Sequence, residues 1–134
     1  MIAADSQSIY WYLASPQRFS DAALESLGTA EDDDGIVVSA WTVPELWMAA
    51  TRKQASRAVP RDAYELVRAT LLDPTTSLSV VAFDERMWPH FEAVSLKLRD
   101  PFDSAVVATA LTVGIDLVTS DAAIAAADVV AVAW

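Results

Sequence analysis

Residues 100–121, DPFDSAVVATALTVGIDLVTSD, decide the fold class of this chain. Their pattern predicts an apolar helix over Pro101 to Val113, with proline in the first turn and Gly114 at the C-terminal end. The apolar run Ile115 to Thr119 predicts a strand, and a short helix is expected from Asp121 to Ala126. A helix followed directly by a strand and then a helix is typical of an α/β protein with parallel strands.

The same alternation runs through the rest of the chain. Further strands are predicted at Ile2 to Ala4, Ile36 to Ser39, Leu78 to Ala82 and Val129 to Trp134. Further helices are predicted at Ser6 to Ala14, Ser20 to Leu27, Thr42 to Arg52, Pro60 to Leu72, and Asp84 to about Leu96. The acidic run Glu31 to Asp34, with Gly35, is expected to be a solvated turn. We therefore expect an α/β fold whose mainly parallel sheet is covered by helices on both faces.

Length and composition indicate one domain over residues 1–134, because 54% hydrophobic residues are enough for one core. The longest uncharged stretches are shorter than the roughly 18 apolar residues that a membrane span needs, so no membrane span is expected. The N-terminal residues lack the basic region of a secretory signal. We expect a cytoplasmic protein.

Residue counts exclude several chemistries. The chain has no cysteine, which excludes thiol catalysis and Cys-ligated zinc, and His90, its only histidine, is interpreted as structural. The glycines at positions 28, 35 and 114 fit no phosphate-binding loop. A formal charge of −10 argues against loose, charge-driven binding to nucleic acid but does not exclude a specific site. Any catalysis must therefore depend on carboxylates.

Four carboxylates stand where a strand gives way to a helix: Asp5, Glu45, Asp103 and Asp121. In an open α/β sheet the carboxyl ends of parallel strands face one crevice, so these side chains are expected to converge. Four anionic groups in one crevice repel each other unless a cation lies between them. Oxygen ligands of this kind favour Mg²⁺ or Mn²⁺ over zinc or copper.

Each acid also has a local structural explanation. Asp5 is a plausible N-cap, and Thr42-x-x-Glu45 is a capping-box pattern. Thr119 or Ser120 could cap the last helix, which leaves Asp121 as a helix-start charge. Capping does not explain why strand ends from across the chain all present acids.

Asp103 is the acid that capping explains least well. It is the only ionisable residue between Asp100 and Asp116, on a helix that is apolar on nearly every face, and we therefore expect it to be buried. Asp100 already serves as a plausible cap for that helix. A buried carboxylate is rarely kept without a partner, so a metal ion is a reasonable one for Asp103.

Two other groups of residues have a structural and a functional interpretation. The basic stripe Arg52, Lys53, Arg57 and Arg61 fits a solvated helix end, and alternatively a surface that steers a nucleic-acid backbone. The aromatic residues fit a core, and alternatively a groove for a helix of a partner protein: Tyr10, Trp11, Tyr12, Trp41 and Trp47. In each case the structural interpretation is preferred.

An ordered set of motifs resembles the PIN-domain ribonucleases, specifically the VapC-type toxins of bacterial toxin–antitoxin pairs. The set is Asp5-Ser6, Ser39 with Glu45, Asp100-Pro101-Phe102-Asp103 with Ala108-Thr109-Ala110-Leu111, and Leu117-Val118-Thr119-Ser120-Asp121. The resemblance implies a PIN-like three-layer α/β/α sandwich with a mainly parallel central sheet. It covers the chain from the first strand to the terminal Val-Ala-Trp.

The resemblance also implies an activity. Asp5, Glu45, Asp103 and Asp121 would bind Mg²⁺ or Mn²⁺ and cleave RNA endonucleolytically, with Ser6, Thr119 and Ser120 as orienting neighbours. A small cognate VapB-type antitoxin would block the site with a basic side chain, and homodimers are common in the family. Two positions depart from the usual pattern: Ser104 replaces a common arginine, and Ser6 a common threonine.

Two other functions compete with a ribonuclease. A receiver-like signalling domain also has an acidic Mg²⁺ pocket on an α/β sheet, but it uses an adjacent acid pair where Asp5 stands alone. A non-catalytic PIN-fold module that only binds its partner has the same sequence features as the enzyme.

Overall fold

A five-stranded sheet forms the centre of the computed structural model, which describes residues 1–52 and 58–134. The strand order is β3-β2-β1-β4-β5, and every pairing is parallel. The strands are β1 (Ile2–Ala4), β2 (Ile36–Ser39), β3 (Leu78–Val81), β4 (Leu117–Val118) and β5 (Val132–Ala133). The prediction of a mainly parallel sheet is confirmed.

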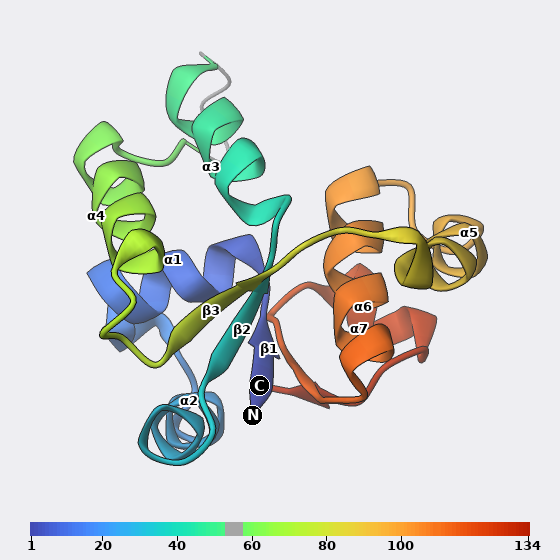
Figure 1. The fold of residues 1–134 in the computed structure, drawn as a ribbon, viewed down its shortest axis with the longest axis horizontal. Helices are drawn as coiled ribbons and strands as arrows, with labels where there is room; N and C mark the ends of the chain where they lie inside the picture. The colour runs from blue at the N-terminus through green and yellow to red at the C-terminus, as the bar shows by residue number, and fades with distance from the viewer. Residues whose placement is uncertain (53–57) are drawn as a thin grey trace.

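Helices cover both faces of this sheet (Figure 1). One layer contains α1 (Ser6–Ala14), α2 (Asp21–Asp32), α3 (Thr42–Thr51) and α4 (Arg61–Leu72). The other contains α5 (Trp88–Ser95), α6 (Pro101–Val113) and α7 (Ala122–Ala127). Short 3₁₀ helices, η1 (Pro16–Arg18) and η3 (Glu85–Met87), follow α1 and precede α5. The predicted three-layer α/β/α sandwich is confirmed.

Most predicted boundaries agree with the structure to within two residues, and α1 and α6 agree at both ends. The solvated turn predicted at Glu31 to Asp34 is wrong in its first half, because α2 continues to Asp32. The Tyr12 hydroxyl donates a hydrogen bond to the Glu31 carboxylate, and this contact from α1 supports the extra turn. Strands β4 and β5 are also shorter than predicted.

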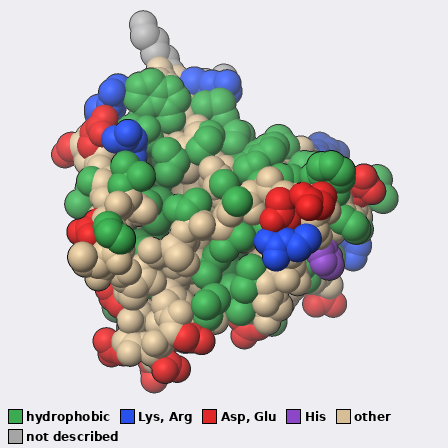
Figure 2. Space-filling view, viewed as in Figure 1, with side chains coloured by type: hydrophobic (Ala, Val, Ile, Leu, Met, Phe, Trp, Pro, Cys, Tyr) green, Lys and Arg blue, Asp and Glu red, His purple; other side chains and the backbone are tan. Residues whose placement is uncertain are grey.

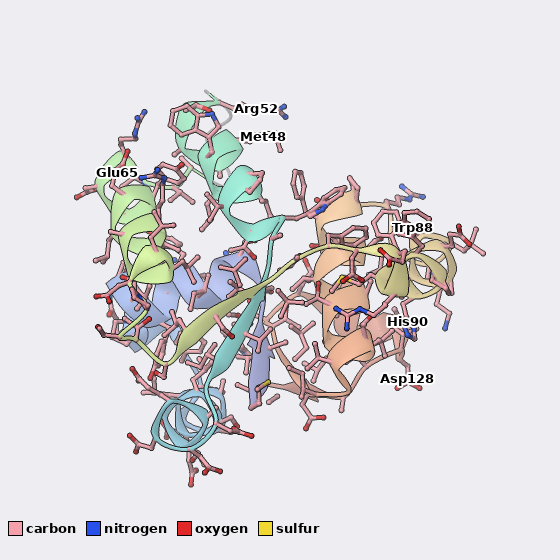
Figure 3. The ribbon with its side chains drawn as sticks, in the orientation of Figure 1. Met48, Arg52, Glu65, Trp88, His90 and Asp128 are labelled. Atoms are coloured by element: carbon pink, nitrogen blue, oxygen red, sulfur yellow. The ribbon has the colours of Figure 1, made fainter. Side chains whose placement is uncertain are left out.

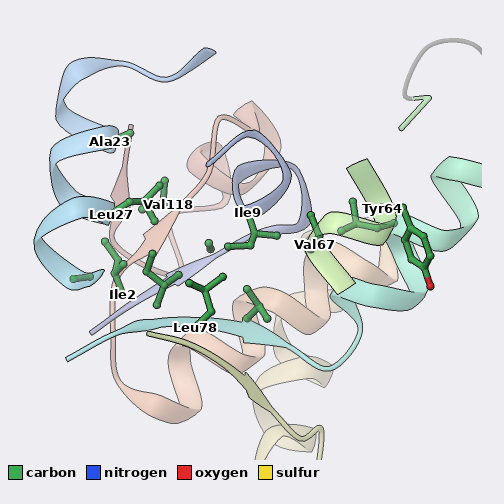
Figure 4. Close-up of a cluster of buried hydrophobic side chains, with 13 residues drawn as sticks. Ile2, Ile9, Ala23, Leu27, Tyr64, Val67, Leu78 and Val118 are labelled. Carbon is green, nitrogen blue, oxygen red and sulfur yellow. The ribbon is translucent and has the colours of Figure 1, made fainter. Parts of the chain in front are cut away.

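The alternation of side chains along β1 divides the core into two clusters. Ile2 and Ala4 point into the cluster shown in Figure 4, where they meet Ile9 of α1 and Leu27 of α2. Ala3 points into the other, which contains Val94, Leu98, Val106, Val107, Ala110, Leu117 and Ile124. Because successive residues of a strand face opposite sides, three residues of β1 serve both layers.

The strand order also excludes one rival function. In receiver-like sheets the first strand pairs with the third, whereas here β1 pairs with β2 and β4. The receiver-like alternative is therefore wrong at the level of the fold. The order reverses between β1 and β4, and α/β proteins bind ligands beside the carboxyl ends of the strands at such a point.

Charged side chains are unevenly spread over the face shown in Figure 2. Acidic side chains gather over α2 at the lower edge, and basic side chains lie over the ends of α3 and α4 near the top. Of the predicted basic stripe, Lys53 and Arg57 lie outside the described residues. Figure 3 shows Arg52 at the end of α3 that is farther from the sheet.

Within residues 1–52 and 58–134, no helix combines the length and the hydropathy needed to cross a membrane.

Gly35, at the start of β2, offers a test of the sheet. Its φ of +97° is a left-handed conformation, and an added Cβ would lie 2.7 Å from the carbonyl oxygen of Ser77. We expect Gly35→Ala to lower the free energy of unfolding by about 1–3 kcal/mol, measured by urea denaturation. Gly28→Ala is the matched control: it lies within α2 with nothing within 4 Å of the added Cβ, and it should stabilise the protein by about 0.5–1 kcal/mol. Equal effects of the two substitutions would contradict this account.

Candidate active site

Asp5 lies directly after β1 and is the N-cap of α1, as predicted. Its Oδ1 accepts a hydrogen bond of 2.6 Å from the Ser8 amide, and its Oδ2 accepts one from the Thr119 hydroxyl. The residue is only 8% exposed. Burial raises the pKa of the Asp5 carboxyl, although the bonds from Thr119 and Ser8 favour the ionised form. Asp5 is therefore a buried acid held between two strand ends.

Asp121 is itself the N-cap of α7, so the prediction that Thr119 or Ser120 could cap this helix is wrong. The Asp121 carboxylate accepts hydrogen bonds from the amides of Ala123 and Ile124, at 2.7 and 3.3 Å. Thr119 has a different role. Its hydroxyl oxygen accepts a 3.0 Å hydrogen bond from the Asp121 amide, and the same hydroxyl donates a hydrogen bond to the Asp5 carboxylate. One threonine thus connects the two acids across β1 and β4.

Ser120 lies at the edge of the same region. Its hydroxyl is 3.5 Å from Oε1 of Gln7, at the outer limit of a hydrogen bond. Within the part of the chain that the structure describes, no hydrogen bond joins the Ser120 side chain to Asp5 or Asp121. Its predicted role as an orienting neighbour stays a prediction.

Glu45 does not form the predicted capping box. The N-cap of α3 is Trp41, with helical backbone angles (φ −81°, ψ −11°) and no side-chain cap, and the Thr42 side chain is buried. The Glu45 carboxylate instead accepts a hydrogen bond from the Ser6 hydroxyl of α1. This contact between helices turns Glu45 toward the carboxyl end of β1, where it lies half-buried.

Asp103 occupies the first turn of α6, and Asp100 is the N-cap of this helix, as predicted. The Asp100 carboxylate accepts a 2.9 Å bond from the Phe102 amide. Asp103 is half-buried, not fully buried as expected, because it faces a cleft, whereas residues Ser104 to Ala110 are fully buried. Burial and the nearby carboxylates of Asp100, Asp121, Glu45 and Asp5, in that order, raise the pKa of Asp103 to about 7.

All four acids line one cleft of about 320 Å³ at the carboxyl ends of β1 and β4. The lining comprises Asp5, Ser6, Gln7, Tyr10, Trp11, Arg18, Glu45, Leu46, Ala49, Ala58, Val59, Asp103, Val106 and Asp121. The acids come from four different segments of the chain, and the fold therefore brings together residues as far apart as Asp5 and Asp121. This is the convergence expected from the strand order.

The donor set suits a hard cation, since every acidic ligand offers only oxygen. The raised pKa of Asp103 agrees with this, because burial and the neighbouring carboxylates both disfavour its negative charge, and a cation would stabilise that charge. In the arrangement of the side chains in the described ranges, however, no three acidic or histidine groups lie close enough to enclose one metal ion. The chemistry of the residues fits a divalent ion, while their present spacing is wider than a closed coordination shell.

The PIN domain family model matches residues 2–130, nearly the whole chain. The chain belongs to the PIN domain family. Ribonuclease VapC22 of Mycobacterium tuberculosis (strain ATCC 25618 / H37Rv) is 30% identical to this PIN domain over 125 residues, which cover 90% of the chain and 86% of that protein. The family predicted from the ordered motifs is confirmed.

Solved structures share the fold of this PIN domain. The crystal structure of VapBC2 from Rickettsia felis bound to a DNA fragment from their promoter matches with a TM-score of 0.67, at 14% identity, covering 98% of this chain and 97% of that chain. The crystal structure of FitAcB from Neisseria gonorrhoeae matches with a TM-score of 0.61, at 17% identity, covering 98% and 96%. These similarities confirm the fold class.

The aromatic residues do not all belong to the core. Trp47 is 40% exposed, which contradicts its predicted place in the core, and Arg61 lies over its ring, with its guanidinium carbon 4.5 Å from the ring centroid. Tyr10 and Trp11 are half-buried and line the cleft, together with Arg18. No motif marks Arg18 in the sequence, because its place in the cleft depends on the packing of η1 beside α1.

The pKa of Asp103 predicts a pH-dependent effect of Asp103→Asn on stability. Its pKa is higher in the folded state than the ordinary 3.8, so the native state retains a proton that the unfolded chain loses, and stability falls as pH rises from about 4 to 7. Without metal at pH 8, Asp103→Asn should stabilise the protein by about 1–2 kcal/mol, because it removes an unfavourable charge from the cleft. This value is smaller than the free energy that the whole pKa shift corresponds to, since water screens part of the effect at a half-buried group.

The difference should become small near pH 3.5, where the folded state holds the proton and most unfolded chains do as well. Chemical denaturation in EDTA at the two pH values measures it. Asp116→Asn is the control, since Asp116 is exposed and lies outside the lining of the cleft, and it should change stability little. A destabilising Asp103→Asn at pH 8 would contradict the raised pKa of Asp103, which comes from burial and from the neighbouring carboxylates.

Proposed function

We propose that this PIN domain is a metal-dependent endoribonuclease, the toxin of a type II toxin–antitoxin pair. The observation that carries the proposal is the convergence of Asp5, Glu45, Asp103 and Asp121 on one cleft. The similarity to a protein named Ribonuclease VapC22 supports RNA as the substrate. Acidic side chains without cysteine or a cleft histidine leave metal-assisted hydrolysis as the chemistry that these residues can perform.

The four acids would hold Mg²⁺ or Mn²⁺, as family membership implies. A divalent ion bound there supplies an activated water and neutralises charge on the leaving oxygen. The hydroxyl of Thr119 fixes the Asp5 carboxylate, and the hydroxyl of Ser6 fixes that of Glu45. These two donors limit the rotation of the carboxylates and so keep them directed at the cleft.

The partner proposed for this chain is a small VapB-type antitoxin. Solved structures of the same fold are the VapBC2 and FitAcB assemblies, which supports an antitoxin partner here. A formal charge of −10 and an acidic cleft suit a basic side chain from such a partner. A homodimer, expected from the family, is proposed as well.

RNA cleavage by the purified chain tests the activity. We expect cleavage in Mg²⁺ or Mn²⁺ that EDTA abolishes, and a loss of more than about 100-fold in Asp5→Asn and Asp103→Asn, because each removes a charge from the metal site. Asp116→Asn should cleave at the parent rate. Product analysis on a labelled RNA gives the rates.

The competing function is a non-catalytic PIN domain that only binds its partner. Absence of cleavage by the folded parent in both ions, on structured and unstructured RNA, would favour it. Full cleavage by folded Asp103→Asn would instead contradict the assignment of the site.

Metal binding can be measured without activity. Mn²⁺ at about 100 times its dissociation constant should stabilise the parent by about 2.7 kcal/mol, seen as a rise in Tm. Asp103→Asn should lose most of this rise, whereas Asp116→Asn should keep it. An equal rise in all three proteins would place the bound ion outside the cleft.

A further inference from the structure

One wall of the acidic cleft is aromatic and basic, and it has no role in the chemistry assigned above. Tyr10 and Trp11 of α1 and Arg18 of η1 form this wall, which we call the Trp11–Arg18 wall. The guanidinium carbon of Arg18 lies 5.4 Å from the centroid of the Trp11 ring. A cation over an indole face is an attractive arrangement that holds both side chains in place.

The Trp11 ring packs against other aromatic side chains. Phe19 meets it edge-on, with ring centroids 6.2 Å apart, and Trp134 lies 5.8 Å away. Phe19 and Trp134 also contact each other at 5.2 Å. The indole is nevertheless only half-buried and lines the cleft. It is therefore a rigid aromatic surface beside the four acids.

Arg18 carries a charge that the described residues do not neutralise. Its side chain is exposed, and no carboxylate of residues 1–52 or 58–134 lies within ion-pair distance. Among the described residues that line the cleft, it alone is positively charged, and four lining residues are acidic. The four acids repel the phosphates of an approaching RNA strand. Arg18 is the group on this wall that attracts a phosphate.

We infer that the Trp11–Arg18 wall is a nucleotide subsite for single-stranded RNA: Arg18 pairs with a phosphate next to the cleaved one, and the attached base stacks on Trp11. This inference rests on the proposed function and names the form of RNA that the site accepts. Unpaired bases stack on aromatic rings and on guanidinium planes, whereas bases in a duplex are not free to do so. A basic peptide from a partner protein fits this wall less well, because Arg18 repels it.

Binding of a fluorescein-labelled, unstructured RNA decamer to the Asp103→Asn protein tests the role of Arg18 without cleavage. Adding Arg18→Gln should weaken binding at least about fivefold in low salt. It should also make the negative slope of log K against log salt less steep by about 0.7. Arg18→Lys should restore most of the affinity, because it keeps the charge. Arg68→Gln, an exposed arginine of α4 outside the cleft, should change neither quantity.

Trp11 is tested in the same assay. Trp11→Leu should weaken binding roughly tenfold through loss of stacking, while Trp11→Phe, which keeps an aromatic face and the packing on Phe19, should lose less than about threefold. Trp88→Leu is the control: Trp88 is 59% exposed, and Figure 3 shows it on α5, apart from α1. A duplex RNA of the same sequence should bind equally to the Asp103→Asn protein with and without Trp11→Leu.

The outcomes separate this inference from the proposed function. In the active parent, Arg18→Gln should raise KM for RNA at least about fivefold and leave kcat within about twofold, as expected for a residue that binds the substrate equally in the ground state and the transition state. If the parent does not cleave RNA, the proposed function fails, and the binding data still decide the subsite. If Arg18→Gln and Trp11→Leu leave RNA binding unchanged, the inference is overturned. It is equally overturned if the two substitutions leave RNA binding unchanged and weaken the binding of a partner peptide.

Discussion

The parallel pairing of β1 with both β2 and β4 is the constraint on which the rest of the structure depends. Ala3 is in register with Val37 on one side and with Leu117 on the other. The chain leaves the carboxyl end of β1 toward one helical layer and that of β4 toward the other, so the two exits diverge and leave a crevice. Asp5 and Thr119 stand at the two exits, and the hydrogen bond between their side chains spans the crevice. The cleft is a consequence of the strand order.

The cleft combines residues that serve the fold with residues that work against it. Asp5 and Asp121 cap helices and accept backbone hydrogen bonds, so their charges also hold α1 and α7. Asp103 has no such benefit, because Asp100 already caps α6, and burial together with the surrounding acids raises its pKa to about 7. Sites that concentrate like charges commonly reduce stability in return for function. A bound cation would remove this repulsion, which explains how an acidic cleft is compatible with a stable domain.

Local signals were enough to predict α6, because Asp100, Pro101 and Gly114 mark its ends within the helix itself. The identity of the four acids followed from the strand-end pattern, and their meeting in one cleft from the properties of parallel sheets. Contacts between distant segments could not be predicted. The Ser6 hydroxyl donates a hydrogen bond to the Glu45 carboxylate, which a capping box would have used. The Tyr12 hydroxyl donates one to the Glu31 carboxylate, and this contact supports the longer α2. Arg18 gave no signal, because only the packing of η1 beside α1 places it near the acids.

The separation of Asp5 and Thr119 by 114 positions has a consequence for synthesis on the ribosome. Chains are made from the N-terminus, so β1 and α1 emerge first, whereas β4 emerges only when most of the chain has been translated. Until then Asp5 lacks its hydroxyl donor, Asp121 is absent, and the first layer of helices packs on a sheet without one of its inner strands. Non-local parallel pairing of this kind also forms slowly. The complete cleft therefore exists only in a finished molecule, and a nascent or truncated chain cannot assemble it.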